Sequence, residues 1–160
     1  MQRPHPPIWV GGRGDRLLGV VARQADGWNA AWTWTPDSYR ARLRVLHAAC
    51  ETADRDPATV TRSLGLYTLV GEDRRDLQAR FERLCELSPA GVMAGRSLEE
   101  WRRGRLVGTV DEVHEQAAGW EALGVDTLIV SVGALPFSIT VGDDVALAAA
   151  SLVGDEPRTH

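Results

Sequence analysis

The chain has 160 residues, of which 44% are hydrophobic and 25% are charged, a balance typical of one soluble globular domain. Its net charge is −4 and its isoelectric point is about 5.5, which argues against a basic surface for nucleic acids. All 18 basic residues are arginines, so a Schiff-base lysine and the lysine of a P-loop are both excluded.

The same composition predicts a cytoplasmic protein without a metal site. No apolar run reaches membrane-spanning length, and residues 1–7 do not have the pattern of a signal peptide. Cys50 and Cys85 fall on the apolar stripes of predicted helices, as expected for buried thiols in a reducing compartment. No metal-ligand spacing occurs among the four histidines, which are His5, His47, His114 and His160.

Hydrophobic periodicity predicts strands that alternate with helices. The predicted strands cover residues 7–10, 27–31, 62–70 and 125–132. The predicted helices cover residues 15–25, 36–53, 74–87, 110–123 and 143–152, with one short helix after Ser97 in the otherwise irregular stretch 88–108. This alternation predicts an α/β fold with about four parallel strands and flanking helices. We expect a single domain over residues 1–160, with its core at about 6–153 and a frayed tail at 154–160.

Several short polar signals mark the predicted helix ends. Asp15 is a candidate N-cap, and Thr35 followed by Pro36 is typical of a helix start. Capping-box spacing separates Ser97 from Glu100 and Thr109 from Glu112. We expect Asp143 and Asp144 to cap the last helix, and the group Arg102, Arg103 and Arg105 to lie on a solvated face.

A glycine-rich turn joins the first predicted strand to the first helix, in the segment Val10, Gly11, Gly12, Arg13 and Gly14. Glycines bring backbone N–H groups close to a ligand, and the helix N-terminus adds partial positive charge, so this turn is a candidate phosphate site. A purely structural turn is the alternative. The dinucleotide fingerprint is not met, because Leu17 stands where its third glycine belongs.

Aromatic and polar residues follow at the next strand. Trp28 lies on this strand, and Asn29 offers a donor and an acceptor near its carboxyl end, where parallel α/β folds bind ligands. Trp32 and Trp34 are expected either to line a planar ring or to pack the end of the fold. The apolar loop 133–140, after the last strand, is expected to form a wall or lid.

These segments together resemble one family. Residues 7–12 (Pro-Ile-Trp-Val-Gly-Gly) and 25–29 (Ala-Asp-Gly-Trp-Asn) are similar to the luciferase-like monooxygenase superfamily. Residues 108–113 and 123–130 extend the resemblance, although Val110 stands where members commonly have proline. The runs 62–66 and 133–138 resemble the branch that uses the deazaflavin coenzyme F-420, with FMN as the other cofactor of the superfamily. The resemblance spans nearly all of residues 6–150.

The resemblance implies the C-terminal half of a (β/α)8 TIM-type barrel, a fold that usually needs about 250 residues. The family's usual catalytic polar residues, much of its ring pocket and an unusual cis peptide belong to the other half, so no catalytic residue is assigned here. The resemblance does imply that Gly11, Gly12 and neighbouring backbone groups bind the cofactor phosphate, with Trp28 and Asn29 nearby.

A half-barrel has two unpaired strand edges and an apolar inner face that water would reach in a monomer. We therefore expect one of three states. Two copies form a homodimeric pseudo-barrel, a complementary N-terminal half-chain completes the barrel, or the chain is an inactive truncated product that aggregates.

The leading functional hypothesis is part of an oxidoreductase that moves a hydride between F-420 and a small organic substrate. An FMN-dependent monooxygenase is an alternative. A non-catalytic half-barrel that binds a flavin or phosphate is a second, and an unrelated phosphate-binding α/β domain rests on the glycine turn alone.

Overall fold

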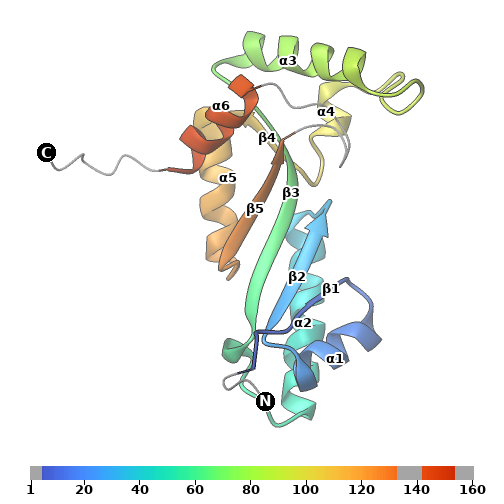
Figure 1. Cartoon of the computed structure of the whole chain (residues 1–160), viewed down its shortest axis with the longest axis vertical. Coiled ribbons are helices and arrows are strands. Elements are labelled where there is room, and N and C mark those ends of the chain that lie inside the picture. Colours follow the sequence, from blue (N-terminus) through green and yellow to red (C-terminus); the bar gives the residue numbers. More distant parts are fainter. Residues whose placement is uncertain (1–4, 133–141, 154–160) are drawn as a thin grey trace, which may run out of the picture.

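The computed structural model describes residues 5–132 and 142–153 and has one parallel sheet. Its strands are β1 (Trp9–Gly11), β2 (Gly27–Trp32), β3 (Thr61–Gly71), β4 (Leu106–Thr109) and β5 (Thr127–Val132). Its helices are α1 (Asp15–Gln24), α2 (Pro36–Thr52), the 3-10 turn η1 (Pro57–Thr59), α3 (Arg74–Leu87), α4 (Leu98–Trp101), α5 (Val110–Ala122) and α6 (Gly142–Leu152). Figure 1 shows β2, β3 and β5 running along the long axis of the molecule.

The sheet is an arc of four parallel strands in the order β1-β2-β3-β5, as the sequence predicts. The fifth strand, β4, was not predicted, because four residues are too few to show a period and its partner is the far end of β3. Thr68 pairs with Leu106 of β4 and with Val132 of β5, so these two strands lie on opposite edges of β3. Since β2 pairs with β3 only as far as Leu66, β4 continues along the edge where β2 ends.

One face of the sheet is covered by helices α1, α2, α5 and α6. Alternate residues of the strands point to this face, among them Trp28 and Ala30 of β2 and Leu64 and Leu66 of β3. They pack against buried helix side chains, which include Leu18, Val21, Tyr39, Leu46, Val113, Trp120 and Ala148. Burial of one such large side chain stabilises the fold by about 1.5–3 kcal/mol, so this layer is the main source of stability.

The opposite face of the arc, here called the open face, carries exposed apolar side chains. The exposed fractions are 45% for Trp9, 41% for Trp32 and 40% for Ile129. In β5, Leu128 and Val130 pack into the core while Ile129 lies on the open face. An inner face reached by water agrees with the predicted half-barrel.

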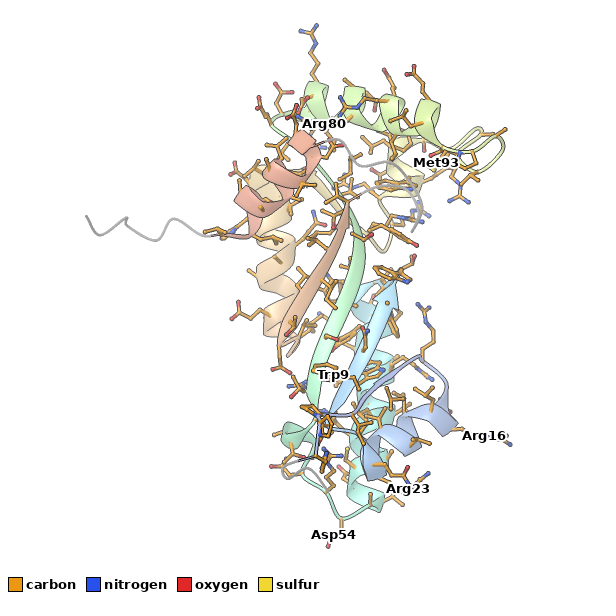
Figure 2. All side chains as sticks on the ribbon, viewed as in Figure 1. Trp9, Arg16, Arg23, Asp54, Arg80 and Met93 are labelled. Carbon is orange, nitrogen blue, oxygen red and sulfur yellow. The ribbon has the colours of Figure 1, made fainter. Side chains whose placement is uncertain are left out.

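A second hydrophobic cluster forms where β3 runs past β2. Leu69 of β3 and Val107 of β4 pack there against Phe81 of α3 and Trp101 of α4, with Met93 also buried. Figure 2 shows Met93 at this end of the molecule and Trp9 toward the other end. This second cluster, here called the upper cluster, covers the far end of β3 and its partner β4, beyond the barrel-like arc.

An ion-pair group ties α3 to α6. Arg80 donates to Asp76 at 2.7 Å and to Asp144 at 2.6 Å, and Arg83 reaches Asp144 at 3.1 Å. Figure 2 shows Arg80 beside both helices. The prediction for Asp144 needs correction, because this nearly buried carboxylate neutralises arginines of another helix.

The other helix ends agree with the sequence in most cases. Thr35 accepts from the amide of Ser38, and complete capping boxes form at Ser97 and Thr109. Helix α1 differs, because Gly14 is its N-cap and Asp15 is the first helical residue. No helix in residues 5–132 and 142–153 is long and apolar enough to cross a membrane.

Tyr39 lies at the centre of an aromatic cluster in the main core. Its ring stacks on Trp28 with 5.4 Å between centroids and meets Trp34 and Trp120 edge-on. Its hydroxyl is buried without a hydrogen-bond partner among the described residues. This burial raises the pKa of Tyr39 to about 12.

We expect Tyr39→Phe to leave the free energy of unfolding unchanged or raise it by up to about 1 kcal/mol, because it removes an unsatisfied hydroxyl. Tyr39→Leu, which removes the ring, should lower it by roughly 2–4 kcal/mol. In the wild type, the stabilisation that the neutral Tyr39 gives to the fold is complete well below pH 10 and is lost as the pH rises toward 12. The reason is that the tyrosine of the unfolded chain ionises at lower pH than the buried one. Urea unfolding at pH 7 to 11 tests both points, and an equal alkaline loss in Tyr39→Phe would contradict the second.

Candidate functional site

The glycine turn lies at the carboxyl end of β1, where Gly12 adopts φ +135°. Its amide donates to the carbonyl of Asn29 at 3.3 Å, and its carbonyl accepts from Trp28 Nε1 at 2.8 Å. A Cβ on Gly12 would stand 3.1 Å from the Leu17 side chain. The residue at position 12 is therefore restricted by its φ and by the close approach of Leu17.

The turn presents free backbone donors next to the start of α1. The amides of Arg13, Gly14, Asp15 and Arg16 donate no hydrogen bond within the described part of the chain. Nothing lies within 4 Å of a Cβ built on Gly14, so the space in front of it is open. Asp15 brings a negative charge to the helix start, but Arg42 Nη1 neutralises it at 2.6 Å. Unpaired amides at a helix start favour a negative charge, so the turn stays a candidate anion site.

Arg13 binds the neighbouring loop instead of extending away from the turn. Its Nη2 donates to the carbonyls of Thr33 at 3.0 Å and of Ala31 at 3.4 Å. Its guanidinium lies 4.2 Å from the ring centroid of Trp34. The residue remains exposed, so it adds positive charge beside the turn while joining the β1–α1 and β2–α2 loops.

The other predicted site residues divide between the two faces of the sheet. The half-buried Val10 side chain packs into the core, and Trp28 is fully buried and supports the turn from the helix side. Asn29 pairs in register with Gly11 and Ser63 and so belongs to the open face. Its Oδ1 is buried without a hydrogen bond in the described residues, which leaves an acceptor available next to the turn.

The two tryptophans after β2 have different surroundings. Trp34 is 2% exposed and packs on Trp28 and Tyr39, whereas Trp32 is 41% exposed and stacks on Tyr67 with 5.4 Å between centroids. A Cβ on Gly65 would stand 3.4 Å from the Trp32 ring, so Trp32 lies over the open face. The peptide bond between Ala31 and Trp32 is cis. Trp34 therefore packs the end of the fold, whereas lining a planar ring stays a prediction for Trp32.

Two residues that sequence analysis did not assign to a site lie beside Trp32. Tyr67 is its stacking partner, and the guanidinium of Arg105 lies 5.9 Å from the Tyr67 centroid. The expected solvated face is therefore wrong for Arg105, which is half-buried between aromatic rings. No sequence signal pointed to this contact, because it depends on the unpredicted strand β4.

Among the described residues no group of histidine, cysteine or acidic side chains is arranged to hold a metal ion. The free thiols are Cys50, which is buried, and Cys85, which is partly buried, and burial raises the pKa of each. The predicted wall or lid at residues 133–140 lies outside the described residues. The candidate site consists of the turn, Asn29 and the aromatic residues near Arg105.

Comparison with known proteins identifies the family. The sequence profile of the family described as luciferase-like monooxygenase matches residues 1–127, which is more than half of the chain. The chain belongs to this family. The Gly-Gly turn, the Asp-Gly-Trp-Asn segment and β3 all lie inside the matched range.

Individual relatives match at modest identity and over part of their length. A phthiodiolone/phenolphthiodiolone dimycocerosates ketoreductase from Mycobacterium tuberculosis is 30% identical over 98 residues, which are 61% of this chain and 25% of the relative. An F420-dependent hydroxymycolic acid dehydrogenase from the same species is 29% identical over 87% of this chain and 38% of its own. This chain therefore spans well under half the length of both.

Solved structures confirm the fold class. An F420-dependent secondary alcohol dehydrogenase superposes with a TM-score of 0.66 at 12% identity, over 93% of this chain and 48% of that one. The α/β arc is thus shared with this enzyme and corresponds to about half of its chain.

We expect Gly12→Ala to lower the free energy of unfolding by about 1–2 kcal/mol, because alanine is strained at φ +135° and meets Leu17. Gly14→Ala is the matched control. Its φ of −78° suits any residue and its Cβ position is open, so its unfolding should change by less than about 0.5 kcal/mol. Urea unfolding measures both, and equal losses would argue against the strained turn.

Proposed function

We propose that this chain is the phosphate-binding half of a coenzyme F-420-dependent oxidoreductase of the luciferase-like type, which acts on a small organic substrate. The observation that carries this proposal is the turn after β1, where the amides of residues 13–16 donate no hydrogen bond within the described residues, the Cβ position of Gly14 is open, and Arg42 neutralises Asp15. The similarity of this chain to an F420-dependent hydroxymycolic acid dehydrogenase supports F-420 as the cofactor. FMN is the alternative, because a backbone phosphate site suits both molecules.

The residues present fit a phosphate-bearing cofactor. Glycine at positions 11, 12 and 14 leaves no side chain in front of the amides, and Arg13 adds positive charge without a carboxylate partner in the described residues. The unpaired Oδ1 of Asn29 would accept a hydrogen bond from a polar group of the cofactor. Val10 and Trp28 would hold the turn from the core.

The cofactor, when bound, supplies hydride transfer to or from carbon. This chain's own contribution is binding and orientation. Backbone amides fix the phosphate, and the open face of β2 and β3 provides one wall of the space beyond it. No role in proton transfer is assigned to a residue of this chain.

We expect the purified chain to bind F-420 more tightly than FMN in a fluorescence titration, with inorganic phosphate competing against both. Gly12→Ala should weaken binding about tenfold, because the turn that aligns the amides is distorted. Gly119→Ala, on an open surface of α5, is the control that should leave affinity unchanged.

The same titration discriminates among the functional alternatives. Binding without oxidation or reduction of the cofactor by any added substrate would favour a non-catalytic module. A folded chain that binds neither F-420 nor FMN nor phosphate would contradict the proposal.

We also propose that a second half-barrel completes the sheet, supplied by another copy or by a separate N-terminal half-chain. The support is the open face, where Trp9, Trp32 and Ile129 are each at least 40% exposed. A twofold pairing of four-stranded arcs would give eight parallel strands, the number in a TIM-type barrel.

Light scattering should give a homodimer for the chain alone, or a one-to-one complex when it is co-expressed with the N-terminal half of a relative. Ile129→Glu should abolish that association by placing a charge on the open face. Val20→Glu on α1, at a site 37% exposed among the helices, is the matched control and should associate normally. A monodisperse monomer in both experiments would contradict completion of the barrel.

A further inference from the structure

Arg105 is held between aromatic rings at the edge of the open face. Its guanidinium carbon lies 5.1 Å from the ring centroid of Trp101 and 5.9 Å from that of Tyr67. Its Nη1 donates to the carbonyls of Trp101 at 2.6 Å and Arg103 at 3.2 Å. These contacts hold the guanidinium of Arg105 in place more firmly than that of a solvent-exposed arginine.

The register of β4 places Arg105 on the same face as Trp32. Leu106, the first residue of β4, pairs with Thr68, and Arg105 directly precedes this strand with its guanidinium 5.9 Å from the Tyr67 ring centroid. Side chains alternate along a strand, and Leu106 belongs to the helix-covered core while Val107 belongs to the upper cluster. Arg105 therefore shares the face of Val107 and Tyr67, which is where Trp32 stacks.

The charge of Arg105 has no carboxylate partner within the described residues. Its Nε is buried without a hydrogen bond, and no acidic oxygen in these residues lies within 4.0 Å of its guanidinium. Desolvation by burial, and to a lesser degree the nearby positive charge of Arg96, lowers its pKa below the ordinary value. A half-buried unpaired cation costs stability, and an anion in contact with it would recover that cost.

Trp32 provides a flat apolar surface next to this charge. A Cβ built on Gly65 would stand 3.4 Å from Cζ3 and 3.5 Å from Cε3 of Trp32, so this edge of the indole lies over Gly65. One side of the indole is covered by Tyr67, yet 41% of the residue stays exposed. An exposed tryptophan on a rigid strand end is a stacking surface for a planar group.

We propose that Trp32 and Arg105 form a substrate subsite for a planar, carboxylate-bearing molecule, with the conjugated part on the Trp32 indole and the carboxylate on the Arg105 guanidinium. This inference rests on the proposed function, which places the cofactor phosphate at the separate turn after β1. Arg105 takes no part in a covalent step. It binds and orients the substrate by a charge-assisted hydrogen bond, and its fixed geometry selects anions over neutral analogues.

Isothermal titration with 2-naphthoate and its neutral analogue 2-naphthamide tests the subsite in the full chain. The wild type should bind 2-naphthoate at least about tenfold more tightly, since hydrogen bonds to charged groups are the stronger class. Arg105→Gln should remove that preference, and Arg105→Lys should restore part of it. Arg103→Gln, an exposed arginine in the same turn, is the matched control and should keep the preference. Trp32→Leu should weaken both ligands alike.

Equal binding of the two ligands by the wild type would overturn the proposal, and this comparison holds even if Arg105→Gln fails to fold. Loss of the preference for 2-naphthoate in Arg103→Gln as well would also overturn the proposal. The preference would then come from the general positive charge of this turn and not from a contact with Arg105.

A parallel titration with F-420 separates the subsite from the cofactor site. Arg105→Gln should bind F-420 as the wild type does. A tenfold loss there would assign Arg105 to an anionic group of the cofactor and overturn the substrate role. Conversely, naphthoate selectivity without F-420 binding would leave the subsite standing and contradict only the proposed function.

Discussion

The two edges and two faces of β3 organise the whole molecule. Its eleven residues pair with β2 and β4 along one edge and with β5 along the other. Leu64 and Leu66 point into the helix-covered core, while Tyr67 and Leu69 belong to the upper cluster. Because both clusters share this strand, a shift of its register by one residue would exchange their side chains and disrupt both layers.

The glycine turn depends on this core through a single side chain. Trp28 lies in β2 between the turn and α2, stacks on Tyr39, and donates its indole N–H to the Gly12 carbonyl. The position of the turn is therefore coupled to the packing of the aromatic cluster. Since an anion site needs donors that are held in place before the ligand arrives, a rigid core below the turn favours binding.

The open face joins the two proposed ligand contacts. The turn lies at the carboxyl end of β1, Asn29 lies on the next strand, and Trp32 and Tyr67 follow toward Arg105. The carboxyl ends of parallel strands meet at one rim of the sheet, which is where α/β barrels bind their ligands. A phosphate at the turn and a carboxylate at Arg105 would bind at two points along the same rim.

The sequence by itself determined the alternation of strands and helices, the arc of four parallel strands, most helix caps, the glycine turn and the family. These follow from local periodicity, from capping spacing and from motifs of adjacent residues, which act before the chain is folded. Only the tertiary structure decided that Asp144 neutralises Arg80, that Trp34 is buried while Trp32 is exposed, and that Arg105 lies between Tyr67 and Trp101. The first depends on α3 meeting α6, the second on where β2 and β3 place the two rings, and the third on the segment that precedes β4. Such pairings are set by the packing of the whole sheet, not by local preference.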